Sequence, residues 1–311
     1  MGLISLWNTR KRESYLSFEY EKIINSPYNT QNLIIDQNLS SEDKMKVSGL
    51  LSDGISLFFS IWEKDSKTMP STITKENYNE YTLDKYNPAI EYFDKVLTLD
   101  KDNTQAFEYK AHSLFLNRYF EEAIEIYRIV SKEKNDSVSW NDLGVALMEY
   151  GLSLNKRHKG KFNLLGCDQL EEAIKCFELA LSKNPKNICS TLNLAHLYHS
   201  TDNFLAASFN YNRALEPDEN NIHVLINAAK NYLSMDLFSE SKELYNKAIE
   251  IDPSFMKNYF DDSASSICTD GYDDLMFLKM GIEINPDSPI INSQFIEVSL
   301  RRLLHAKNKD G

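Results

Sequence analysis

The sequence contains little glycine and little proline, and it has no excess of positive charge. Only 10 Gly and 8 Pro occur in 311 residues, which argues against a turn-rich all-β fold. The net charge is −12, which argues against general nucleic-acid binding, because contacts to phosphate groups need a basic face. We therefore expect no nucleic acid among the partners.

Cysteines and long apolar runs are also scarce. The four cysteines are Cys167, Cys176, Cys189 and Cys268. They form no Cys-x-x-Cys pair, so they are expected to be reduced thiols in a cytoplasmic protein. The most apolar stretch, residues 49–62, contains Asp53 and is shorter than the roughly 20 apolar residues that a bilayer span needs. We expect no stable membrane insertion.

Motifs of common enzyme classes are missing from the sequence. It has no Walker loop, no dinucleotide fingerprint, no HExxH helix, no nucleophile elbow and no kinase motif. Acid–base, nucleophilic or phosphoryl-transfer chemistry usually leaves one of these traces in a chain of this length. We therefore predict a protein that is not an enzyme and that has no catalytic residues and no cofactor.

The sequence does contain a repeated phrase, of which "DQLEEAIKCFELALSKNPKN" at 168–187 is one instance. Each phrase has a marker residue, usually small, followed four residues later by a large apolar residue and seven residues later by a compact one. These three positions lie on one face of an α-helix. The markers are Ala89, Ala123, Ala173, Ala207, Ser241 and Asp274, so that most intervals are 33 or 34 residues and one is 50.

A second helical phrase precedes each of these, most clearly "WNDLGVAL" at 140–147. Two helices of about a dozen residues at a constant period predict an array of helical hairpins. One such hairpin cannot bury its apolar face alone, so neighbouring hairpins are expected to stack into a continuous core. Solvent-facing positions are then free to vary, which explains why the residue types differ between repeats while the spacing of the core positions is kept.

At these residues the chain resembles the tetratricopeptide repeat (TPR) family. The closest match opens with Trp140, Leu143, Gly144 and Leu147 and closes with Ala173, Phe177, Ala180 and Pro185. The resemblance implies an all-α fold, namely a right-handed α-solenoid of about six TPR hairpins with a C-terminal capping helix. It also implies that the first helix of each hairpin lines a concave groove.

The repeat phase gives a predicted division of the chain. Residues 1–46 are an unassigned segment that is helical in part, and 47–103 are a degenerate first repeat with an insertion. Residues 104–288 hold repeats two to six, with a further insertion at about 151–168 in the third. Residues 289–311 are the capping helix and tail.

Polar residues recur at fixed positions of the first helices and predict a peptide-binding groove. Asn offers both a donor and an acceptor to an extended peptide backbone, although Asn and Asp are also tolerated wherever water reaches. The predicted groove residues are Asp142, Asn193, His196, Asn227, Lys230 and Asp261. Cys189, His196, His199 and His223 are residue types that bind zinc or copper, but they have no regular ligand spacing, so no metal is predicted.

The predicted third-repeat insertion carries the main local concentration of positive charge. Its basic residues are Lys156, Arg157, Lys159 and Lys161. Such a cluster can dock an acidic partner or a phosphate, and it can equally be a solvated loop.

The predicted function is a non-catalytic scaffold or adaptor that binds a segment of another protein in the concave groove. One alternative is an accessory or substrate-recruiting subunit of a glycosyl- or protein-modifying enzyme complex. Another is an assembly factor at a membrane surface. The sequence does not identify the partner or the oligomeric state.

Overall fold

The computed structural model describes residues 33–68, 84–157, 168–265, 267 and 272–307. Within these ranges the chain forms thirteen α-helices and no strand, so the predicted all-helical fold is confirmed. The helices group into two compact units, residues 1–193 and 194–311. The boundary falls inside α9 (Ile188–Ser200), and each unit is described by itself.

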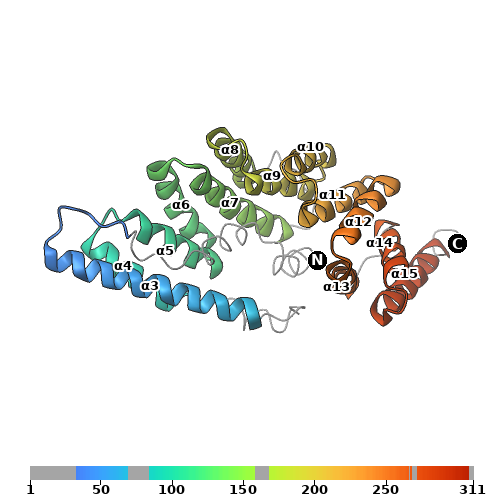
Figure 1. The fold of residues 1–311 in the computed structure, drawn as a ribbon, viewed down its shortest axis with the longest axis horizontal. Helices are drawn as coiled ribbons and strands as arrows, with labels where there is room; N and C mark the ends of the chain where they lie inside the picture. The colour runs from blue at the N-terminus through green and yellow to red at the C-terminus, as the bar shows by residue number, and fades with distance from the viewer. Residues whose placement is uncertain (1–32, 69–83, 158–167, 266, 268–271, 308–311) are drawn as a thin grey trace. The chain divides into compact units, whose positions relative to one another are not determined.

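The first unit contains three successive helical hairpins, drawn from blue to yellow-green in Figure 1. Each helix packs against the next one along the chain, as expected for hairpins that cannot bury their apolar faces alone. The bounds of its helices are α3 Ser41–Thr68, α4 Asn87–Leu99, α5 Thr104–Leu116, α6 Phe120–Lys134, α7 Ser137–Arg157 and α8 Asp168–Lys183.

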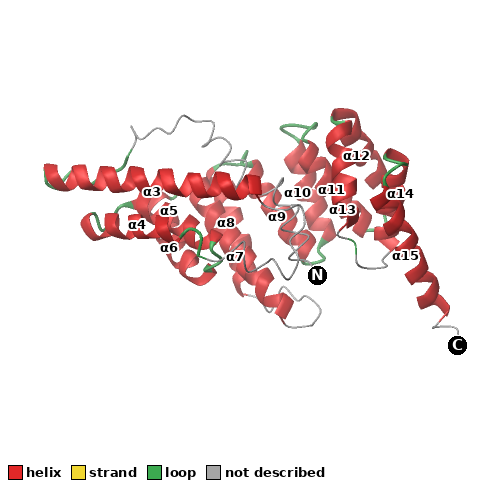
Figure 2. Ribbon diagram, turned by 90° about the horizontal axis from the view of Figure 1, so that it is seen from below, coloured by secondary structure: helices red, strands yellow, loops and turns green. Residues whose placement is uncertain are grey.

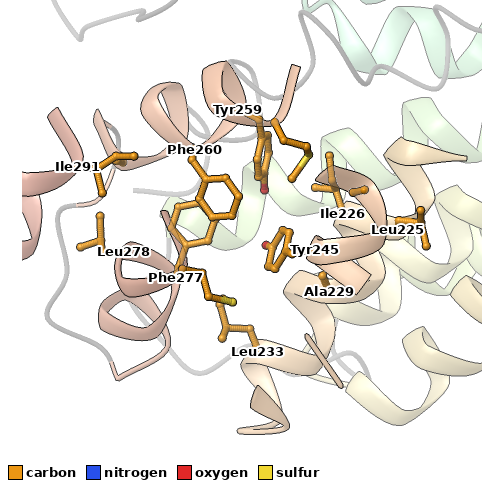
Figure 3. Packing of buried hydrophobic residues seen from close by; sticks show 14 of the residues in the cluster. Leu225, Ile226, Ala229, Leu233, Tyr245, Tyr259, Phe260, Phe277, Leu278 and Ile291 are labelled. Carbon is orange, nitrogen blue, oxygen red and sulfur yellow. The ribbon is translucent and has the colours of Figure 1, made fainter. Parts of the chain in front are cut away.

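The second unit continues the same arrangement and ends in a longer helix that packs on both α13 and α14. Its core includes aromatic rings from successive hairpins, and the rings of Phe260 and Phe277 stack with their centroids 4.8 Å apart (Figure 3). The bounds are α10 Phe204–Leu215, α11 Ile222–Ser234, α12 Phe238–Ile251, α13 Pro253–Ser265, α14 Tyr272–Ile284 and α15 Pro289–Lys307.

The repeated marker positions form the core, as the period predicted. The markers are fully buried from Ala89 to Ser241, whereas Asp274 is half-buried. The large residues four positions on are likewise buried: Phe93, Tyr127, Phe177, Tyr211, Tyr245 and Leu278. Small residues therefore stand where helices approach closely, and large ones fill the space between them.

Gly144, on α7, shows why a close approach between two helices needs a small residue. A Cβ atom added there would lie 2.6 Å from Cε1 of Phe177 on α8, far inside van der Waals contact. Because the ring of Phe177 is fully buried, it has little room to move away. The glycine thus lets α7 and α8 meet face to face.

The turns within the hairpins share an unusual backbone conformation. Asp84, Arg118, Asp202 and Asp236 all have positive φ, between 59° and 66°. Asp84 and Arg118 are 34 residues apart, as are Asp202 and Asp236, so each residue has the same place in its repeat. Non-glycine residues adopt this conformation at a cost, and the composition gave no sign of it, because the usual glycine is absent.

Two predicted segments, the insertion at about 151–168 and the tail at 289–311, can be compared with the described helices. α7 runs on to Arg157, so residues 151–157 of the expected insertion are helical, and Gly151 allows a close contact with Leu170 of α8. The predicted 289–311 segment forms α15, which ends at Lys307. Among the described helices, none combines the length and the apolar character needed to cross a bilayer.

Candidate functional site

The six residues predicted to line the groove differ in how far they reach solvent. Asp142, Asn193 and Asn227 are buried, with 8%, 1% and 8% of their surface exposed. His196, Lys230 and Asp261 are half-buried. The six predicted groove residues therefore divide into two sets. Three are covered by other side chains, and three are reached by water.

Asn193 is held by hydrogen bonds inside the first unit. Its Nδ2 donates to Oδ1 of Asn141, 2.9 Å away, and the Ser190 hydroxyl donates to the same oxygen at 3.0 Å. All three side chains are buried, and buried amides need such partners. Asn193 thus helps to join α7 to α9. Asn141, one residue before the predicted Asp142, was not identified from the sequence.

Asp261, in the second unit, also has partners within the chain. Its Oδ2 accepts a hydrogen bond from Nδ2 of Asn285 at 3.2 Å, and its Oδ1 accepts one from the hydroxyl of Ser288. Asp261 therefore ties α13 to the turn that precedes α15. The neighbouring Lys230 lies on α11, with its Nζ 5.0 Å from the centre of the Tyr259 ring, in cation–π contact.

Asp142 belongs to a cluster of ionisable side chains that the sequence did not reveal. The cluster, called here the Asp142 cluster, consists of Glu108, His112, Tyr127, Lys134 and Asp142. Nζ of Lys134 lies 2.9 Å from Oε1 of Glu108, and Nδ1 of His112 is 2.6 Å from the Tyr127 hydroxyl. Ligand atoms of Glu108, His112 and Asp142 lie within 4.8 Å of one another. Three hairpin helices, α5, α6 and α7, supply these groups.

Burial in the Asp142 cluster changes the protonation of its members. Burial, reinforced by the neighbouring carboxylate of Glu108, raises the pKa of Asp142 to about 8, although Lys134 opposes the shift. Burial lowers the pKa of His112 to about 4. At neutral pH the cluster therefore holds a protonated Asp142, a neutral imidazole and the Lys134–Glu108 ion pair.

The Asp142 cluster contains residue types that bind metals, since carboxylate and imidazole groups together suit zinc and other divalent cations. However, the ammonium group of Lys134 already supplies a positive charge beside Glu108. A cation could share this place only if Lys134 turned away. The ion pair and the protonated carboxyl therefore account for the cluster as a structural network.

The other metal-binding residue types singled out in the sequence have different surroundings. Cys189 is buried and forms no disulfide with another described residue. Nδ1 of His199 lies 2.9 Å from Oδ1 of Asn231, and burial lowers the pKa of His199. His223 packs edge-on against the ring of Phe255. These surroundings are those of side chains packed within the fold.

A polar hollow of about 500 Å³ lies at the turns of the second unit. It is lined by His199 and Phe204 from one hairpin and by Leu233 of the next, together with the two left-handed residues Asp202 and Asp236. A side chain of a bound protein could enter this hollow.

The basic residues of the predicted insertion are only partly covered by the structure. Lys156 and Arg157 belong to the last turn of α7, but their side chains lie outside the described residues. Lys159 and Lys161 lie outside them altogether. Their role stays a prediction.

Hairpins of this kind, joined in series and packed through small residues, define the class of helical repeat proteins. The tetratricopeptide repeat family model matches residues 81–103 and 222–255. The chain therefore contains tetratricopeptide repeats in these two segments, as its resemblance predicted.

Solved structures agree with this fold. A thermophilic TPR protein from Thermus thermophilus is similar, with a TM-score of 0.50 and 16% identity over 69% of this chain and 97% of that one. The C-terminal part of a TPR repeat-containing protein from Cytophaga hutchinsonii gives a TM-score of 0.51 and 14% identity, over 80% and 84% of the two chains. At such identities the likeness shows the fold alone. A comparison with curated proteins gave no match.

Proposed function

We propose that this chain is a non-catalytic interaction module that holds a segment of another protein against its first helices. The supporting observation is the recurrence of polar side chains at one position of successive first helices. Asn193, Asn227 and Asp261 follow one another at intervals of 34 residues, and Glu108 precedes Asp142 by the same interval. TPR proteins bind protein or peptide partners, which supports the same role.

The half-buried residues of the second unit are the ones we expect a partner to touch. His196 and Lys230 lie 34 residues apart, three positions after Asn193 and Asn227. Because Asn193 and Asn227 are covered by their own chain, we assign them to shaping the surface. An imidazole and an ammonium group suit carboxylates or main-chain carbonyl groups of a bound segment. Cys176 and Cys189 are buried and form no disulfide among the described residues, which fits a cytoplasmic location.

The double variant His196→Ala with Lys230→Ala tests this proposal. Tagged wild-type and variant chains would be purified from cells with their partners, and the recovered proteins compared by quantitative mass spectrometry. We expect recovery of the specific partner to fall at least about tenfold, because hydrogen-bonding groups that meet the partner are lost. The circular-dichroism melt should change little, since both side chains are only half-buried.

Lys175→Ala is the matched control, because Lys175 is an exposed lysine on a second helix, α8. This variant should retain the partner at the wild-type level. Equal recovery with the double variant would show that the first helices of the second unit do not hold the partner.

A further inference from the structure

The last described helix, α15, has an apolar side that is largely exposed among the residues that the structure describes. One face packs inward through Ile291 and Val298, both fully buried, with Phe295 against the same core. The other face exposes four large aliphatic side chains, here called the outer stripe. The outer stripe comprises Ile296, Leu300, Leu303 and Leu304, which are 58%, 54%, 61% and 61% exposed.

The spacing of the outer stripe is that of a helix-packing surface. Intervals of four, seven and eight residues from Ile296 place all four side chains on one side of an α-helix. Contiguous exposed apolar patches mark interaction sites. In Figure 2 the C-terminal part of α15 extends beyond α14, and each of the four side chains is more than half exposed.

The charges beside the outer stripe indicate what covers it. Glu297 and Arg301 lie on the same edge of the stripe and form an ion pair one helical turn apart. If a second α15 packs antiparallel across a two-fold axis near Ser299, the Arg301 of each copy lies beside the Glu297 of the other. Ile296 and Leu300 of one copy then alternate in height with the same residues of the other and can interdigitate, while Leu303 and Leu304 lie at the two ends of the contact. The edge is therefore complementary to itself.

We infer that the outer stripe is a self-association surface, through which two copies of this chain pair by antiparallel packing of α15. Such an isologous contact is the commonest way in which identical chains associate. The helices would pack like those of other antiparallel pairs, with their axes about 8–10 Å apart. This assignment is independent of the partner-binding surface proposed on α9 and α11 and of its residues His196 and Lys230.

The size of the stripe sets the strength of the pairing. Four aliphatic side chains from each copy make a surface smaller than the roughly 1,200–2,000 Å² of a standard stable interface. We therefore expect a dimer that dissociates on dilution into the micromolar range. Salt should weaken it further, because the Glu297 and Arg301 edge is exposed to solvent.

Sedimentation velocity of the full chain, over a hundredfold range of concentration, measures the association. The wild-type chain should show a monomer–dimer equilibrium, and Leu300→Glu with Leu304→Glu should weaken it at least tenfold. The matched control is Leu205→Glu with Phe209→Glu, an apolar pair on α10 that is 75% and 69% exposed with the same spacing. The control should associate as the wild type does.

A charge exchange tests the antiparallel arrangement. Glu297→Arg and Arg301→Glu should each abolish pairing at low salt, because each places like charges on the shared edge. An equimolar mixture of the two variants should pair again. A monomeric wild-type chain at every concentration would overturn the inference, as would pairing that survives the Leu300 and Leu304 changes. Binding of a monomeric chain to anionic lipid vesicles through this stripe would overturn it in favour of a membrane contact.

Discussion

Replacing Asp142 by Asn should change how the stability of the first unit depends on pH. The raised pKa of Asp142, about 8 against 3.8 for an ordinary Asp, means that the folded chain holds a proton which the unfolded chain releases above pH 4. The stabilisation from this proton is complete below pH 3.8 and is lost as the pH rises towards 8. Asn resembles the protonated carboxyl in shape and cannot ionise, so the variant lacks this dependence.

The magnitude follows from the linkage between protonation and folding. Each pH unit between the two pKa values corresponds to about 1.4 kcal/mol, so from pH 5 to pH 8 the wild type should lose roughly 4 kcal/mol relative to Asp142→Asn. Since Glu108 and Lys134 lie near the side chain of residue 142 in both proteins, their own titrations largely cancel in the difference. The lowered pKa of His112 acts below pH 6.5 and is present in both as well.

Urea unfolding followed by tryptophan fluorescence at pH 5, 6, 7 and 8 provides the measurement. All three Trp residues lie within residues 1–193, so the signal reports on the first unit. Asp53→Asn, an exposed carboxylate on α3, is the control and should follow the wild-type curve. If the free-energy difference between wild type and Asp142→Asn stays constant across this range, the assignment of a protonated Asp142 is refuted.

Two further changes test the packing and the turns. Gly144→Ala should lower the free energy of unfolding by about 1–3 kcal/mol in the same fluorescence assay, because its Cβ would collide with Phe177. Gly49→Ala is the control, because no atom lies within 4 Å of a Cβ added there. It should instead stabilise α3 by up to about 1 kcal/mol. Asp202→Gly with Asp236→Gly should raise the melting temperature measured by circular dichroism. Both positions have positive φ, which glycine adopts without a steric penalty, and each change should stabilise the fold by roughly 0.5–1 kcal/mol. An unchanged or lower melting temperature would show that these turns are not strained.

The sequence was sufficient to predict the hairpins and their core. A buried marker such as Ala173 and its partner Phe177 recur at a fixed phase, and that phase depends only on helix geometry. The C-terminal capping helix was predicted from the resemblance to the family. Its apolar outer face was not, because which residues of an amphipathic helix are covered depends on where the helix ends relative to its neighbours.

The burial of the polar positions could not be read from one helix at a time. Asp142 and Asn193 look like solvent-facing residues within their own helices, yet Asn141 and Glu108 from neighbouring helices help to enclose them. One signal was present: Glu108 stands 34 residues before Asp142. Equivalent positions of stacked repeats lie side by side, so two acids at that interval should have been expected to meet.

The contact between Gly151 and Leu170 gives the chain a natural place to accept added sequence. This contact holds α7 against α8. The separation between the end of α7 at Arg157 and the start of α8 at Asp168 is therefore set by the packing of the two helices. Doubling the length of a connecting segment costs only about 0.6 kcal/mol in chain-closure entropy. A fluorescent or affinity module placed there should leave every hairpin intact.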